Sequence, residues 1–99
     1  MARVKIDGVI EAVRYSPNGK IIIVRAYERR GVVWTDHILL ERKGLVERLN
    51  DGKRFVTGER KIYLGSVFET GPKVQFVDEH VVTDGQTATR DLLVGASVF

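Results

Sequence analysis

Two runs of apolar, β-branched residues open the chain and are separated by a short polar stretch. The runs cover residues 4–13 and 21–27, and their length and composition predict β-strands. Between them, Pro17 holds φ at about −65°, while Asn18 and Gly19 accept the tight or left-handed conformations that reverse a chain. We therefore predict a long β-hairpin whose tip carries Arg14, Tyr15 and Lys20.

The middle of the chain predicts a third strand and a short helix. After a turn at residues 28–31, residues 32–40 again have the composition of a strand. The periodicity then changes, because Leu45, Val46 and Leu49 form one apolar stripe on a short helix within residues 43–52. The sequence Asn50-Asp51-Gly52 supplies the C-terminal stop of this helix.

The last part of the chain predicts two more strands. Residues 54–64 alternate as a fourth strand, which Gly58 interrupts as a bulge or sharp bend. Residues 69–73 predict a turn, and a fifth strand follows from residue 74 to about residue 82. After a further turn at residues 83–86, Leu92-Leu93-Val94 is compatible with either a strand or a helical turn.

Five strands with one short helix between the third and the fourth predict a Greek-key OB-fold barrel, an all-β fold. Gly8 and Gly58 suit the bends that close such a barrel. The alternative is an SH3-like barrel, which has only a 3₁₀ turn where this chain has a helical stripe. A chain of 99 residues fits one domain. We expect the barrel in residues 1–82, with residues 83–99 as a C-terminal extension used for packing or oligomerisation.

Strand alternation sorts the side chains into an inner and an outer set. The predicted inner set consists of apolar residues: Ile22, Val24, Ile38, Leu40, Val56, Ile62 and Leu64. The predicted outer set mixes cations with rings: Arg25, Tyr27, His37, Phe55, Lys61 and Tyr63. Such a mixture is typical of single-stranded nucleic-acid binding, in which rings stack on bases and cations follow the backbone. Trp34 shares the parity of the inner set, which favours packing at the core or rim over stacking on a base.

Charge is unevenly distributed along the chain. Residues 1–76 hold 15 Lys and Arg against 9 Asp and Glu, a balance of +6, whereas residues 77–99 hold 1 against 4, a balance of −3. A basic body suits a polyanionic ligand, although the same charge is also compatible with simple solubility.

Composition and motifs argue against several other classes of protein. The chain has no cysteine, its two histidines are 43 positions apart, and it contains no nucleophile or phosphate-loop motif. We therefore expect no enzyme activity, no metal and no cofactor. The longest apolar run, residues 21–24, is too short for a membrane span, and the start of the chain has no signal-peptide core. We expect a cytoplasmic protein without a membrane partner.

Three segments in consistent order resemble the bacterial single-stranded DNA-binding proteins. They are Arg14-Tyr15-Ser16-Pro17-Asn18-Gly19, Thr35-Asp36-His37-Ile38, and Leu49-Asn50-Asp51-Gly52 followed by Val56-Thr57-Gly58-Glu59-Arg60. The resemblance covers residues 3–65. It departs in a short loop between the second and third strands, a shorter helix, and the absence of stacking tryptophans apart from Trp34. The Gly/Pro/Gln-rich tail with an acidic tip is also missing, a feature similar to the tailless primosomal replication protein N.

The resemblance implies an OB-fold that binds single-stranded DNA, with RNA left open, and that assembles as a dimer or tetramer in DNA replication. We expect phosphate contacts from Arg14, Lys20, Arg25, Arg29, Arg30 and Lys61, and base stacking by Tyr27, Trp34, His37, Phe55 and Tyr63. The alternative is a small β-barrel used for protein docking or oligomerisation without nucleic acid. The observation behind this alternative is the apolar stretch at residues 92–99, which one small barrel has little room to bury.

Overall fold

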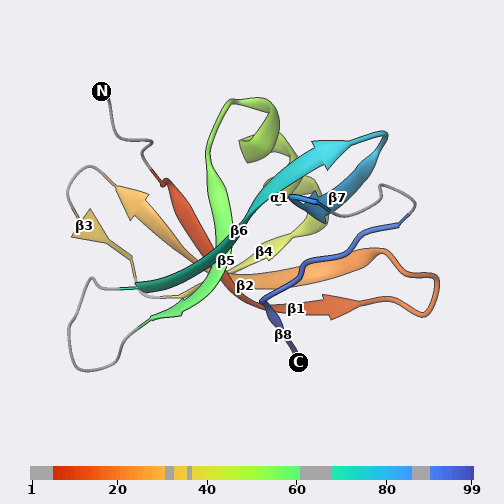
Figure 1. Ribbon diagram of the computed structural model, residues 1–99, viewed down its shortest axis with the longest axis horizontal. Helices are drawn as coiled ribbons and strands as arrows, with labels where there is room; N and C mark the ends of the chain where they lie inside the picture. The colour runs from red at the N-terminus through yellow and green to blue at the C-terminus, as the bar shows by residue number, and fades with distance from the viewer. Residues whose placement is uncertain (1–5, 31–32, 36, 61–67, 86–89) are drawn as a thin grey trace.

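The computed structural model describes residues 6–30, 33–35, 37–60, 68–85 and 90–99. These residues form one mixed β-sheet with a single short helix beside it (Figure 1). The pairing runs in the order β3-β2-β1-β5-β6-β7, with β4 paired to β2 and β8 to β1. The mostly β class with one helix, predicted from the sequence, is therefore confirmed.

Strands β1, Gly8–Tyr15, and β2, Ile21–Arg30, form the predicted hairpin. Its turn is closed by two backbone hydrogen bonds, from Ser16 N–H to the Lys20 carbonyl at 2.7 Å and from Gly19 N–H to the Ser16 carbonyl at 3.0 Å. Gly19 has a φ of +84°, the left-handed conformation that the turn signal predicted.

The β1–β2 ladder contains two irregularities that change which side chains face inward. Ile10 pairs with Ala26 and Ala12 with Arg25, so that Glu11 is left over in β1. At the other end Arg14 pairs with Ile23 and Tyr15 with Ile21, so that Ile22 is left over in β2. A bulge of this kind shifts the alternation of side chains by one position. The inward position predicted for Ile22 is wrong, because Ile21 is buried in its place and Ile22 is 47% exposed.

The predicted third strand is present as two short strands that pair with the same side of β2. Strand β3, Val33–Trp34, pairs with the end of β2, and strand β4, Ile38–Glu41, pairs with its middle. Helix α1, Arg42–Asn50, follows β4 directly. The C-terminal stop is confirmed, because Asp51 caps the helix and Gly52 has a φ of +85°.

Strand β5, Phe55–Arg60, runs parallel to β1 and antiparallel to β6, Phe68–Val77. The irregularity predicted at Gly58 is present as a register shift between Val56 and Gly58, but the extra residue lies in β6, where Gly71 and Pro72 stand opposite Thr57. A Cβ atom at Gly58 would come within 2.1 Å of the Glu69 carbonyl oxygen. The predicted turn at residues 69–73 is wrong, because this segment lies inside β6. Proline is tolerated there because Pro72 lies opposite the irregular part of the ladder, where a missing N–H costs little.

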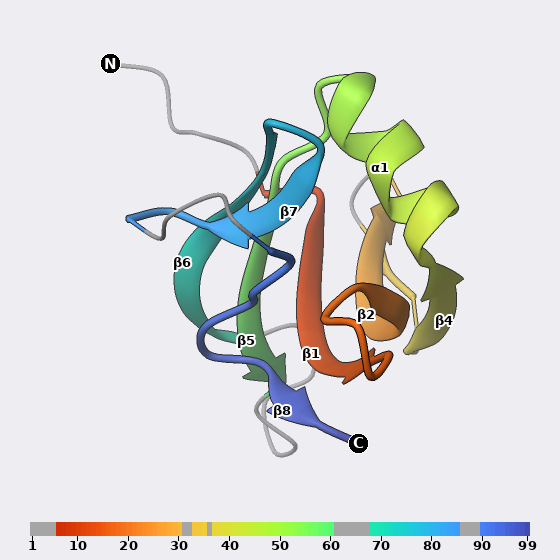
Figure 2. The same ribbon diagram turned by 90° about the vertical axis from the view of Figure 1, so that its right-hand side faces the viewer.

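The predicted fifth strand is interrupted at Asp78 and Glu79, which have φ values of +49° and +67°. Two consecutive left-handed residues are the pattern of a two-residue type I′ hairpin, and they lead into β7, His80–Thr83. The C-terminal segment then runs from β7 to the end of β1 (Figure 2). Leu92 bridges Val82, and strand β8, Ser97–Val98, pairs parallel with β1.

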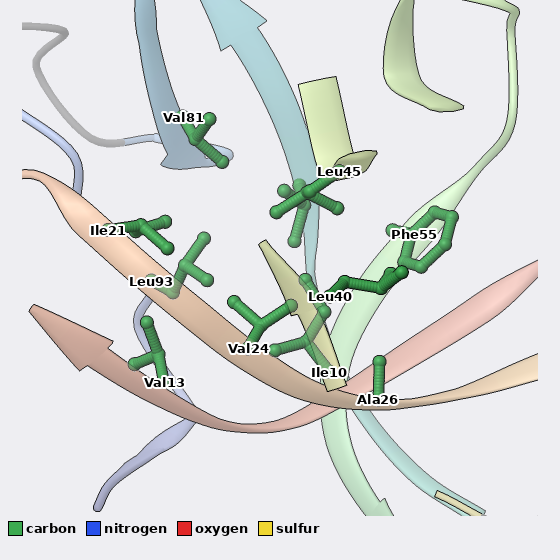
Figure 3. Packing of buried hydrophobic residues seen from close by; sticks show 11 residues of the cluster. Ile10, Val13, Ile21, Val24, Ala26, Leu40, Leu45, Phe55, Val81 and Leu93 are labelled. Carbon is green, nitrogen blue, oxygen red and sulfur yellow. The ribbon is translucent and has the colours of Figure 1, made fainter. Parts of the chain in front are cut away.

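The core lies between the sheet and α1, and its side chains converge from six strands, the helix and the C-terminal segment (Figure 3). Its members are Ile10, Val13, Ile21, Val24, Ala26, Leu40, Leu45, Phe55, Val74, Val81 and Leu93. The predicted burial of Val24 and Leu40 is confirmed, while Ile38 and Val56 are half-buried. Ile62 and Leu64 lie outside the described residues.

Phe55 corrects the outer set, because its side chain is fully buried instead of outward-facing. The cause is its pairing with Gly8, whose lack of a side chain leaves room for the ring. A Cβ at Gly8 would come within 2.3 Å of the Phe55 ring. This space depends on a residue 47 positions away, which alternation within one strand does not reveal.

Candidate nucleic-acid interface

The described candidate residues are spread along the β1–β2 hairpin. Lys20 lies in the hairpin turn, whereas Arg29 and Arg30 end β2 beside β3, at the opposite side of the molecule (Figure 1). A strand of ten residues spans roughly 30 Å. These residues therefore offer separate contact points for an extended ligand instead of one compact site.

A pocket of about 340 Å³ lies at the end of β2, and we call it the β2-end pocket. It is lined by Asp7, Glu28, Arg29, Arg30, Lys53 and Phe55. Both carboxylates are engaged by the protein. Glu28 accepts a hydrogen bond from Arg48 Nε at 2.6 Å, and Asp7 Oδ2 accepts one from the Arg54 backbone N–H at 2.9 Å. With Arg48 offsetting the charge of Glu28, the balance beside the pocket is positive.

Trp34 is placed next to these cations by the β2–β3 ladder, in which it pairs directly with Arg29. Directly opposed residues of an antiparallel pair project to the same face of the sheet. The half-buried Trp34 side chain therefore projects from the same face of the sheet as the Arg29 side chain. Arg30 is exposed and lies 3.9 Å from Glu28, a separation that is long for an ion pair.

A second pocket of about 260 Å³ shares Lys53 with the β2-end pocket, and we call it the Lys73 pocket. Its lining also contains Arg54 and Lys73. None of these three cations was identified from the sequence. The available signal was the dibasic Lys53-Arg54 pair just before β5, but its proximity to Lys73 arises only from the pairing of β5 with β6.

Arg25 and Tyr27 lie on the face of β2 that turns away from the core cluster, where both contact Glu11. Arg25 Nε donates to Glu11 Oε1 at 3.1 Å, and the Tyr27 hydroxyl donates to Glu11 Oε2 at 2.8 Å. His37 meets the Tyr27 ring edge-on, with ring centroids 6.0 Å apart. Tyr27 is only 7% exposed, so its ring is covered instead of open for stacking. His37 itself is exposed.

Arg14 and Arg25 both contact Phe99, a residue that sequence reasoning did not select. Arg14 Nε donates to the Phe99 main-chain oxygen at 3.0 Å, and its guanidinium lies 4.8 Å from the ring centroid. The Arg25 guanidinium lies 5.3 Å from the same centroid. Such cation–π contacts have no signature in the sequence, because Phe99 reaches the arginines only through the pairing of β8 with β1.

The remaining candidates have different surroundings. Lys20 is exposed at the hairpin tip, whereas the Tyr15 hydroxyl accepts a hydrogen bond from Leu93 N–H at 2.9 Å and so holds the C-terminal segment. Phe55 is buried in the core. Lys61 and Tyr63 lie outside the described residues.

A third pocket, of about 360 Å³, has the opposite charge. The described residues lining it include Glu11, Glu59 and Glu69 but no lysine or arginine. Arg25 offsets the charge of Glu11 at 3.1 Å, and Glu59 and Glu69 make the rest of this surface unfavourable for a phosphate backbone. In the part of the chain that the structure describes, no group of His, Asp and Glu has the arrangement of a metal site.

Asp91 is a buried carboxylate that positions the C-terminal segment. It accepts hydrogen bonds from Ile21 N–H at 2.8 Å, Val81 N–H at 2.9 Å and both Nε and Nη2 of Arg42, at 2.7 and 3.2 Å. Burial by itself raises the pKa of the Asp91 carboxyl, but the hydrogen bonds from Arg42 and the two backbone N–H groups outweigh it and lower the net pKa. The same hydrogen bond stabilises the charged form of Arg42 and raises the pKa of its guanidinium.

Among the described helices, none is long and apolar enough to cross a membrane. No protein-family model matches the chain, and no curated protein or solved structure matches it either.

Proposed function

We propose that this chain binds single-stranded DNA, with RNA left open, without catalysing a reaction. The observation that carries the proposal is the β2-end pocket, in which Arg29, Arg30 and Lys53 line one cavity and Trp34 lies across the strand pair from Arg29. Cations that follow a phosphate backbone, combined with a ring for base stacking, are the elements that single-strand binding requires.

The proposed roles follow the exposure of each side chain. Arg29, Arg30 and Lys53 contact phosphates, and Trp34 stacks on a base. Arg14, Lys20 and Arg25 extend the path along the hairpin, where His37 is the exposed ring. Tyr27 and Phe55 have no stacking role in the proposal because their rings are buried. For Lys61 and Tyr63 the sequence-based prediction stands unchanged.

An OB-fold barrel of the bacterial single-stranded DNA-binding family is the architecture that we propose for this activity. Support comes from the β1–β2 hairpin, the position of α1 after the strand that pairs with the middle of β2, and the ladder irregularity next to Gly58. In the described ladders the sheet is open, since no pairing joins β4 to β6 or β7. Closure of the barrel, a homodimer or homotetramer, a cytoplasmic location and a role in replication are parts of this proposal.

The proposal is tested by fluorescence anisotropy with labelled oligo-dT over a range of salt concentrations. We expect micromolar or tighter binding at about 50 mM salt that weakens as salt rises, because bound cations release counterions from the strand. The Arg29→Ala/Arg30→Ala double variant should weaken binding and reduce the slope of log K against log salt by about 1.4, at about 0.7 per lost phosphate contact. Lys43→Ala, an exposed charge on α1 outside both basic pockets, is the control. Wild-type protein that does not bind at about 50 mM salt would refute the proposal.

The second candidate function is a protein-docking or oligomerisation module. The observation that favours it is the group of exposed apolar side chains on short edge strands, Val33 at 64%, Leu39 at 59% and Val98 at 72%. Removing residues 83–99 does not test it cleanly, because Asp91 and Leu93 are buried. The sharper variants are Val98→Asp and Leu39→Asp, with molar mass measured by light scattering. A change in mass with unchanged oligonucleotide binding would separate assembly from ligand binding.

A further inference from the structure

The Lys73 pocket differs from the other pockets in the sign of its lining. Its charged residues are Lys53, Arg54 and Lys73, and no carboxylate lines it among the described residues. None of these three cations forms an ion pair with another residue that the structure describes. By contrast, two carboxylates line the β2-end pocket, and three glutamates line the third pocket, of about 360 Å³. Cations that share one concavity without a described carboxylate in its lining favour an anionic ligand.

The pairing of β5 with β6 explains why these cations meet. Phe55 pairs with Val74 and Val56 with Lys73, an antiparallel register that sets residues 53–54 beside residues 75–76. Val74 is buried, so Lys73 and Gln75, which alternate with it along the strand, project to the other side. Lys53, Arg54 and Lys73 are exposed, and the register of β5 with β6 places all three in the lining of one cavity.

The neighbouring helix end does not cancel this positive charge. The final carbonyl groups of α1 accept backbone hydrogen bonds, from Asp51 to Glu47, from Gly52 to Leu49 and from Lys53 to Arg48, at 3.0 to 3.1 Å. These bonds satisfy the groups that carry the negative end of the helix dipole. Asp51 lies two residues before Lys53, and the Asp84 backbone N–H donates to the Lys73 carbonyl at 2.7 Å, but neither carboxylate lines the pocket.

Uncharged groups in the same lining suit a nucleotide better than a bare inorganic anion. Phe76 lines the pocket as a half-buried ring that packs against the core, while the Asn50 and Gln75 side chains carry amide donors and acceptors. Amides and cations together are groups that contact the base edges and phosphates of a single strand.

We propose that the Lys73 pocket is a second contact site for the same strand that occupies the β2-end pocket. The strand leaves Arg29 and Arg30, passes Lys53, which lines both pockets, and continues to Arg54 and Lys73. Short oligonucleotides occupy the β2-end pocket alone, and longer ones occupy both. This inference rests on the proposed function.

The test compares Lys73→Glu with Lys43→Glu, using oligo-dT of about 4 and about 16 nucleotides, the limits for one OB fold. Both variants change the charge equally, but Lys43 lies on the first turn of α1, away from the pocket. At about 50 mM salt we expect Lys73→Glu to weaken the long oligonucleotide roughly fivefold to tenfold and to reduce its salt slope by about 0.7. Binding of the short oligonucleotide should stay within about twofold, and Lys43→Glu should change neither.

The possible failures are distinguishable. If the wild-type protein binds both lengths and Lys73→Glu matches Lys43→Glu on each, the second contact site is refuted while the proposed function survives. If the wild-type protein binds neither length, both are refuted. Equal loss on the short and the long oligonucleotide also overturns the proposed path, because Lys73 would then act at the first site. Thermal unfolding of each variant verifies that the fold is retained.

Discussion

Replacing Asp91 by Asn should strongly destabilise the protein without changing the shape of the side chain. The Asp91 side chain is fully buried and accepts hydrogen bonds from Ile21, Val81 and Arg42. An amide has one accepting oxygen, so whichever way the Asn is oriented, the two donors facing its NH₂ group lose their acceptor. Of these two, one is a buried backbone N–H and the other belongs to Arg42.

The size of the effect follows from these two losses. A buried N–H without a partner costs about 1–3 kcal/mol, and a hydrogen bond to a charged group contributes about 1.5–3 kcal/mol. Because the Arg42 side chain is 27% exposed, water offsets part of the second loss. We therefore expect the free energy of unfolding to fall by about 3 kcal/mol, a decrease in Tm of about 12–24 °C for a domain of this size.

Urea titration followed by Trp34 fluorescence and circular dichroism measures this change. Asp84→Asn is the matched control, because Asp84 is exposed. A loss below about 1 kcal/mol, or one equal to that of the control, would refute the role of Asp91 as a buried anchor.

The pH dependence of stability supplies a second readout. The pKa of Asp91 is lower in the folded state than in the unfolded chain, so its stabilisation is fully present above the unfolded value of about 4 and is lost as pH falls through the folded pKa. Wild type should therefore lose stability more steeply than Asp91→Asn below about pH 4.

Three further variants test the packing and the candidate interface. Gly8→Val should lower the free energy of unfolding by about 2 kcal/mol or more, because a Cβ at Gly8 lies 2.3 Å from the Phe55 ring; unchanged urea unfolding would contradict this packing. Trp34→Ala should weaken oligo-dT binding by about 1–3 kcal/mol in anisotropy if the ring stacks on a base, and an unchanged Kd would exclude that role. Phe99→Ala should strengthen oligo-dT binding about twofold to fivefold, because it removes the cation–π contacts of Arg14 and Arg25, about 0.5–1 kcal/mol each, while their hydrogen bonds to the Phe99 main chain and to Glu11 remain; weaker binding would show that the ring itself contacts the ligand.

Local signals predicted the parts of the fold that local chemistry determines. The turn at Pro17–Gly19, the apolar stripe of α1 with its stop at Gly52, and a ladder irregularity next to Gly58 are all present where their residue types indicated. The hairpin at Asp78-Glu79 was missed because Glu79 stands where a type I′ turn usually has a glycine.

Alternation failed where it depended on partners elsewhere in the chain. Ile22 is exposed because the β1–β2 register leaves it unpaired, and Phe55 is buried because its partner is Gly8. The same limit applies to the candidate interface. Arg29 and Arg30 were identified from their own segment, whereas Lys73 joins Lys53 only through the pairing of β5 with β6.

Binding of wild-type protein to oligo-dT, followed by anisotropy and by Trp34 fluorescence from about 50 to about 200 mM salt, bears on the nucleic-acid proposal without any substitution. We expect Kd to rise steadily with salt along a linear log–log relation, together with a change in Trp34 emission on binding. Absence of binding at about 50 mM salt, or binding whose affinity does not change with salt, would contradict a phosphate-contacting surface at Arg29, Arg30 and Lys53.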